Sequence, residues 1–219
     1  MKASRISALL LALTCALAFE VHAAEPVSDV SLNAQLLVFA RQGDLPSVRR
    51  LLAMGASPNS RTRVGKTALM LAAENGQLDL ADAMLQAGTD VQLAGTNKVT
   101  PLMAACNAGA VEIARHLLDA GARLDVTDQV DKTAMVYAAG QGHPQIIALL
   151  LSRGVPVNAA YDHQLTALMW AAGNGHPDAV KLLLERGADK SARDDRGLTA
   201  EAMARQAGQA ETAALLADR

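Results

Sequence analysis

A threonine returns every 33 residues along most of this 219-residue chain, and glycines recur at the same period. Self-similarity at a fixed period of this size is typical of solenoids, in which each repeat packs only against its neighbours. The sequence therefore predicts a stack of similar units rather than one central core. The threonine column is Thr67, Thr100, Thr133, Thr166 and Thr199, and the two glycine columns are Gly43, Gly76, Gly109, Gly142, Gly175, Gly208 and Gly55, Gly88, Gly121, Gly154, Gly187.

The unit that begins at Thr166 indicates what each repeat contains. Thr166 suits the N-cap of a short helix, and Gly175 can take the left-handed backbone that commonly ends one. Pro177 suits the first turn of a second helix, which we expect to end at Gly187. Helices this short are not stable alone in water, so the unit must stack against copies of itself.

Four copies of a seven-residue motif identify the repeat more closely. They read TALMLAA (67–73), TPLMAAC (100–106), TAMVYAA (133–139) and TALMWAA (166–172). These motifs resemble the ankyrin-repeat signature T-P-L-H-x-A-A, and the resemblance covers roughly residues 33–218. It implies an all-α ankyrin-repeat solenoid of helix-turn-helix units with hairpin-like connecting fingers. The family's histidine is replaced by Met70, Met103, Val136 and Met169, so the loops must be braced in another way.

We expect a single ankyrin-repeat domain over residues 33–219. Its first unit (33–59) lacks the threonine, and Asn33 is the candidate cap of its first helix. Internal repeats begin at about residues 64, 97, 130 and 163, and a last unit covers about 196–218. In that unit Glu201 and Arg205 stand where inner repeats carry leucine and alanine. Polar outer faces are expected of terminal repeats.

Residues 1–23 have the pattern of a secretory signal peptide. Lys2 and Arg5 precede an apolar run over 6–19, and small residues precede Ala24. The run is too short to span a membrane comfortably. A retained anchor and a lipidated Cys15 are the alternatives.

Export would leave a short flexible lead-in (24–32) and a single cysteine, Cys106, so no intramolecular disulfide could form. Cys106 occupies a column of small residues, which favours a buried packing role. Without a disulfide or an N-x-S/T sequon, the chain fits a bacterial periplasm better than general secretion, which is the alternative. We expect no membrane span after cleavage.

The few aromatic residues suggest a binding site. Tyr137 and Trp170 share one repeat position, and Tyr161 lies just before the Trp170 repeat. The family resemblance implies that this position faces the concave groove, and tyrosine and tryptophan are enriched in binding hot spots. The alternative is that the rings pack between layers. The predicted protein-binding residues are Tyr137, Trp170, Tyr161, Leu71, Asn107, Gln141 and Asn174.

The sequence offers little support for catalysis, cofactors or metals. His143 and His176 stand one period apart and are expected to be structural, and no histidines lie at i, i+4. There is no Cys-x-x-Cys and no glycine-rich phosphate loop. A net charge of −2 gives no reason to expect nucleic acid binding.

These observations predict an exported, monomeric, non-enzymatic scaffold or adaptor that binds another protein through its groove and fingers. The alternative function is a periplasmic inhibitor or immunity protein that blocks a toxic enzyme. Both roles are suggested by analogy at the level of the fold.

Overall fold

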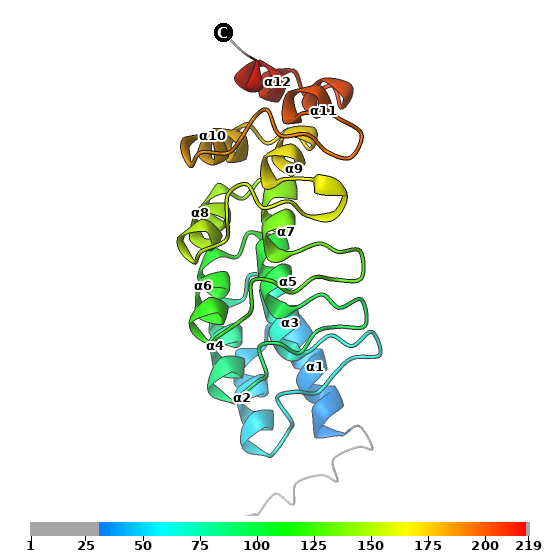
Figure 1. Cartoon of the computed structure of the whole chain (residues 1–219). Coiled ribbons are helices and arrows are strands. Elements are labelled where there is room, and N and C mark those ends of the chain that lie inside the picture. The colour runs from blue at the N-terminus through cyan, green and yellow to red at the C-terminus, as the bar shows by residue number, and fades with distance from the viewer. Residues whose placement is uncertain (1–30, 218–219) are drawn as a thin grey trace, which may run out of the picture. The chain divides into compact units, whose positions relative to one another are not determined.

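The computed structural model describes residues 31–217, which form a stack of paired α-helices (Figure 1). The predicted signal peptide and residues 24–30 of the lead-in lie outside the described residues. Within 31–217 no strand occurs, which confirms the all-α prediction. The six pairs are α1 (Leu32–Gln42) and α2 (Leu45–Ala53), α3 (Ala68–Glu74) and α4 (Leu78–Gln86), α5 (Pro101–Ala108) and α6 (Val111–Asp119), α7 (Ala134–Gly140) and α8 (Pro144–Ser152), α9 (Ala167–Gly173) and α10 (Pro177–Glu185), and α11 (Ala200–Gln206) and α12 (Ala210–Leu216).

The repeated threonines and glycines have the local roles that the sequence predicts. All five threonines are N-caps, and the Thr166 hydroxyl accepts a hydrogen bond from the Met169 N–H at 3.3 Å. Gly175 and Gly187 have φ angles of +76° and +84°, the left-handed region that glycine enters most easily. The 33-residue period is therefore built from the start and stop of each helix.

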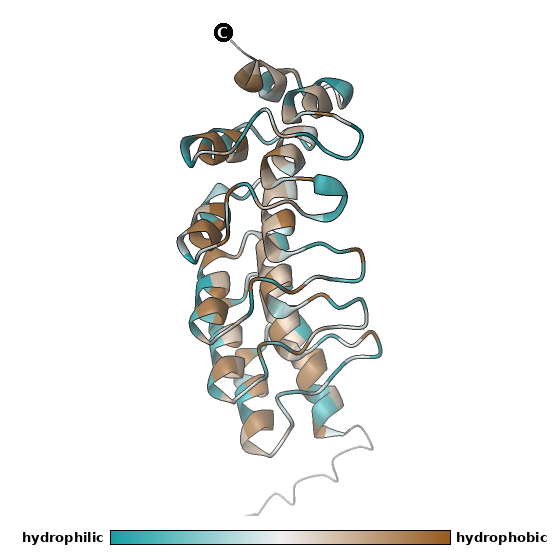
Figure 2. Cartoon of the chain, in the orientation of Figure 1, coloured by the Kyte–Doolittle hydropathy of each residue, from teal (hydrophilic) through white to brown (hydrophobic). Residues whose placement is uncertain are grey.

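The first helices of the pairs form one column and the second helices form another (Figure 1). Small residues let the first helices approach closely, and Ala171 and Ala172 are completely buried. Met70, Met103 and Met169, in the place of the family's histidine, are also buried and so serve packing. Hydrophobic colour concentrates on the helices in Figure 2, whereas hydrophilic colour is prominent on the projecting loops.

Histidines brace successive layers, from a different position than the family's histidine. His143 Nε2 lies 3.1 Å from the carbonyl oxygen of Asn107, and His176 Nε2 lies 2.9 Å from that of Gly140. A Cβ atom at Gly142 would lie 2.4 Å from the His176 ring, so only glycine fits beneath it. The predicted structural role of His143 and His176 is thus confirmed.

The ends of the stack differ from the inner layers. Ser31, and not Asn33, caps α1, because the Ser31 hydroxyl accepts from the Ala34 N–H at 3.3 Å. The Asn33 side chain instead accepts from the Ser57 N–H at 2.7 Å, tying α1 to the loop after α2. At the other end, Arg205 is exposed and pairs with Glu201 at 2.6 Å, giving the last layer the polar surface expected of a cap.

Five loops project from the column of first helices as fingers (Figure 1). We number them finger 1 to finger 5, for residues 56–66, 89–99, 122–132, 155–165 and 188–198. Each finger has a tight turn closed by a backbone hydrogen bond, such as the one from the Asp128 N–H to the Lys132 carbonyl oxygen at 3.0 Å. Isolated bridges, such as that of Arg61 with Thr67, add to this hairpin character. Backbone hydrogen bonds join neighbouring fingers. The Thr96 N–H donates to Val64 at 3.4 Å, that of Gln129 to Asn97 at 3.0 Å, and that of Asp195 to His163 at 3.1 Å.

Candidate functional site

A row of hollows, which we call the groove, follows the first helices beneath the fingers. Tyr137 on α7 and Trp170 on α9 are half-buried, and both line a pocket of about 130 Å³ between them. Trp170 also borders two further hollows, and Tyr137 one. The pocket between the two rings is completed by Lys132, Val136, Gly140, Gln141 and Asn174.

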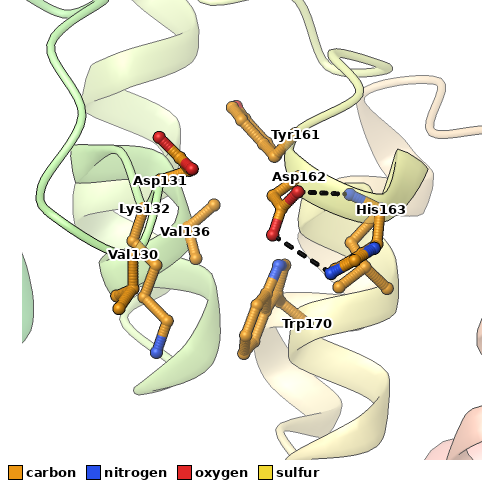
Figure 3. Close-up of a pocket in the computed structure, with 9 residues that line it drawn as sticks. Val130, Asp131, Lys132, Val136, Tyr161, Asp162, His163 and Trp170 are labelled. Atoms are coloured by element: carbon orange, nitrogen blue, oxygen red, sulfur yellow. Dashed lines mark hydrogen bonds and ion pairs between the residues drawn. The ribbon is translucent and has the colours of Figure 1, made fainter.

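A second pocket, of about 170 Å³, lies on the other side of Trp170 under fingers 3 and 4 (Figure 3). Figure 3 shows the indole facing Asp162 and His163, which belong to the short 3₁₀ turn η1 (Asp162–Gln164). Lys132, at the end of finger 3, lies on the opposite side of this pocket, and its ammonium points away from Asp162 and His163. The remaining lining residues are Val130, Asp131, Val136, Tyr161 and Leu165.

The row of hydrogen bonds between fingers is interrupted at this place. Within residues 31–217, no backbone hydrogen bond joins finger 3 to finger 4, although the repeat predicts one from Asp162 to Val130. A hydrogen bond between the first residues of neighbouring fingers is missing here too. The Asp189 N–H donates to Asn158 at 2.8 Å, but Pro156 stands at the equivalent position and has no N–H to donate.

Finger 4 also lacks an internal brace that both of its neighbouring fingers have. Asp128 braces finger 3, because its Oδ1 accepts from the N–H groups of Val130 and Lys132, both at 2.9 Å. Asp194 braces finger 5 in the same way. Tyr161 occupies their repeat position in finger 4 and packs its ring between fingers 3 and 4. The site therefore lies where two fingers are not tied together.

The tyrosine hydroxyls are in environments that favour the protonated form. The Tyr137 hydroxyl donates to Asp128 Oδ2 at 2.7 Å. Burial, followed by this bond and the nearby negative charge, raises the pKa of Tyr137 to about 12. Burial also raises the pKa of Tyr161, and this effect outweighs that of the nearby Thr133 side chain, which lowers the pKa. Both hydroxyls are therefore neutral at physiological pH, and that of Tyr161 is buried with no hydrogen-bond partner among the described residues.

Trp170 combines a cation contact with an unused donor. The Lys132 ammonium lies 5.0 Å from the centre of the indole ring, within the range of a cation–π interaction. The indole Nε1 is buried and has no hydrogen-bond partner among the described residues. The Asn174 amide donates to the Trp170 carbonyl oxygen at 2.8 Å and so helps to end α9. A buried donor without a hydrogen-bond partner is unusual in a folded protein.

The structure brings most, but not all, of the predicted binding residues together. Gln141 and Asn174 line the pocket between Tyr137 and Trp170, and Tyr161 joins Trp170 in the second pocket. Asn107 lies farther along the groove, in a hollow of about 190 Å³ that Tyr137 also borders. Leu71 is the exception. It is 4% exposed and packs in the core, so it has no surface to offer a partner.

Sequence reasoning misses Lys132, Val136 and Leu165, which line the pockets but carry no aromatic signal. Lys132 could have been found by comparing repeats. Lys66 and Lys132 hold the same repeat position. Eight residues after Lys66 stands the acidic Glu74, whereas the residue eight positions after Lys132 is Gly140, so Lys132 lacks the acidic neighbour.

The histidines outside the layer contacts pair with aspartates. His116 Nδ1 lies 2.6 Å from Asp82 Oδ1 on the second helices, and His163 lies 3.4 Å from both Asp162 and Asp195. Over residues 31–217, no group of three histidine, cysteine or acidic side chains could hold a metal ion. Cys106 is completely buried, as predicted, and burial raises the pKa of its thiol.

Comparison with known proteins defines the class. A family profile described as ankyrin repeats, three copies, matches residues 36–128, 121–194 and 159–219. The chain therefore belongs to the ankyrin-repeat family. The members of this family generally act as protein-interaction scaffolds without catalysis. In the described part of the chain, no helix has the length and apolar character to cross a bilayer.

Individual relatives are similar to parts of this chain. The human mitochondrial disaggregase is 37% identical over 90 residues, which is 41% of this chain and 12% of that protein. The Escherichia coli ankyrin repeat protein YahD is 38% identical over 65 residues, 30% of this chain and 32% of the relative. A Rickettsia felis ankyrin repeat protein, RF_p14, is 43% identical over 56 residues, 26% of this chain and 89% of the relative.

Proposed function

We propose that this chain is an exported ankyrin-repeat scaffold or adaptor that binds another protein through the groove around Tyr137 and Trp170. One observation carries the proposal. In adjacent layers, two large amphipathic rings border the same hollow, at the junction where fingers 3 and 4 are not hydrogen-bonded to each other.

Physical arguments support this choice of surface. Tyrosine and tryptophan bury large areas at little cost in side-chain entropy, which is why they dominate binding hot spots. The layers beneath the rings are already packed, so little backbone order has to be gained on binding. Gln141 and Asn174 add polar groups at the edge of the same pocket.

The experiment is an affinity capture from periplasmic extract with wild-type protein and two variants, Trp170→Ala and Tyr137→Ala. We expect a partner that wild type retains and both variants lose, while circular dichroism shows that the variants stay folded. Met54→Ala is the control, because Met54 is an exposed apolar side chain in the first layer, 52% accessible. Capture that both groove variants retain in full would contradict the proposal.

The captured protein also decides between an adaptor and the alternative, an inhibitor or immunity protein. Loss of the partner's enzymatic activity at one equivalent of this chain would favour the inhibitor. Unchanged activity in a stable complex would favour the adaptor.

Export is part of the proposal and has its own test. The pattern of residues 1–23 supports it, and the periplasm of a bacterium is the compartment we propose, with secretion as the alternative. Mass spectrometry of the protein from a periplasmic fraction should find Ala24 as the first residue. A cytoplasmic protein that retains residues 1–23 would contradict export.

A further inference from the structure

Two lysines hold the same repeat position in different layers but have different surroundings. The Lys66 ammonium pairs with the Glu74 carboxylate at 2.8 Å, across the edge of α3. In the layer of α7 the residue equivalent to Glu74 is Gly140, and no carboxylate of the described residues pairs with Lys132. Lys132 lies over the Trp170 ring instead. It is a cation in the groove wall without a counter-charge.

The place that a carboxylate fills beside Lys66 is open beside Lys132. Gly140 and Lys132 both line the pocket of about 130 Å³ between Tyr137 and Trp170. A Cβ atom at Gly140 would meet only the Trp170 ring, at 3.8 Å, so the space next to it is free. The pocket thus combines a cation, two apolar ring walls and two amides, those of Gln141 and Asn174.

The nearby acidic groups of the chain do not neutralise Lys132. Asp128 is buried, and its two oxygens already accept from two backbone N–H groups and the Tyr137 hydroxyl. Asp131 and Asp162 lie toward the fingers in Figure 3, whereas the Lys132 ammonium points to the opposite end of Trp170. His163, which also lines the second pocket, contacts Asp162 and Asp195.

We propose that the protein partner places an aspartate or glutamate side chain in this pocket, where its carboxylate pairs with Lys132 as Glu74 pairs with Lys66. An apolar residue next to that acid packs on Trp170 and Tyr137. The inference rests on the proposed function and adds the chemistry of the contact. The Lys66–Glu74 pair argues for a carboxylate, because the chain itself puts one at the equivalent position.

The first test selects peptides from a random phage-displayed library on the full wild-type chain. We expect the enriched peptides to share an acidic residue beside an apolar one, and to lose binding to Trp170→Ala. Replacing that acid by its amide in a synthetic peptide should weaken binding about two- to fivefold, the effect of a partly exposed ion pair.

The second test couples the peptide to Lys132. Lys132→Met should weaken binding of the acidic peptide by the same factor and leave the affinity for the amide peptide unchanged, as in a double-mutant cycle. Lys181→Met is the control with the same change in net charge, because Lys181 is exposed on α10, in the column of second helices. It should leave both affinities unchanged.

The third test supplies the carboxylate from within the chain. Gly140→Glu should form an ion pair with Lys132 and remove the preference for the acidic peptide over the amide peptide. Gly140→Ala, which adds only a methyl group, should keep that preference.

The outcomes separate this inference from the proposed function. Peptides that need Trp170 but bind equally with acid or amide, or are indifferent to Lys132→Met, would overturn the acidic anchor and leave groove binding in place. A library that yields no peptide dependent on Trp170 or Tyr137 would overturn both.

Discussion

The Tyr137 hydroxyl donates a 2.7 Å hydrogen bond to the Asp128 carboxylate, which joins the wall of the groove to finger 3. The same carboxylate accepts from the backbone N–H of Lys132 at 2.9 Å. One buried acid therefore positions both an aromatic ring and the lysine that lies over Trp170. Finger 4 has no equivalent brace, because Tyr161 replaces the aspartate.

The first prediction concerns the ionisation of Tyr137. Because Tyr137 and Tyr161 are the only tyrosines of the chain, Tyr161→Phe leaves one to observe. Its ultraviolet titration should give a pKa of about 12, raised by burial and by Asp128. Adding Asp128→Asn should lower that pKa toward the ordinary value of about 10. A titration unaffected by Asp128→Asn would contradict the assigned role of this hydrogen bond.

The second prediction follows from linkage between the pKa of Tyr137 and stability. The folded chain holds this proton more tightly than the unfolded chain, so the contribution to stability is complete below about pH 10. It is lost as the pH rises toward about 12, the folded-state value. In urea titrations, wild type should therefore lose more stability than Tyr137→Phe between pH 9 and 12. Equal losses of stability in the two proteins would contradict the raised pKa of Tyr137.

The third prediction concerns the tips of the fingers. Gly65 and Lys98 share one repeat position, and both have positive φ angles, +73° and +61°. Lys98→Gly should stabilise the stack by up to about 1 kcal/mol, because a side chain is disfavoured in this backbone conformation. Urea denaturation measures the change.

The matched control for this prediction should change the stability in the opposite direction. Gly65→Ala should destabilise the stack, since the added Cβ would lie 2.8 Å from the Thr96 nitrogen. A destabilised Lys98→Gly variant would show that backbone strain does not determine the effect of substitutions at this position.

The fourth prediction is that the junction between fingers 3 and 4 exchanges hydrogen quickly. The amides of Gln129 and Asp195 are bonded to the preceding finger, whereas the Asp162 amide has no such bond. After correction for intrinsic rates, Asp162 should exchange at least about tenfold faster than the other two amides in hydrogen–deuterium exchange. Equal protection at the three positions would mean that fingers 3 and 4 are tied like the others.

The fold could be predicted from the sequence because its determinants are local and repeated. Each threonine caps a helix three residues from its hydrogen-bond donor, and the glycines give the left-handed turns that follow the helices. The cap at Ser31 could not be predicted from the period. The first unit has no preceding copy to align with, and Asn33 is an equally good capping residue by type.

The site could be predicted only in part, because it depends on contacts between layers. The repeat position of Tyr137 and Trp170 indicates the right wall, but it also includes Leu71 and Ala104, which are both 4% exposed. Only the larger rings reach the surface from this position. The interruption between fingers 3 and 4 depends on backbone bonds between segments 32 residues apart, which no local pattern encodes.

The most direct test of the central claim uses the fluorescence of Trp170, the chain's only tryptophan. The captured partner is added until size-exclusion chromatography shows that all of the chain is in the complex. The partner must lack tryptophan or carry a label that separates its own emission from that of Trp170. Binding in the groove predicts a blue shift of the Trp170 emission and weaker quenching by acrylamide. An emission spectrum and quenching that stay unchanged in the complete complex would place the partner elsewhere and contradict the account.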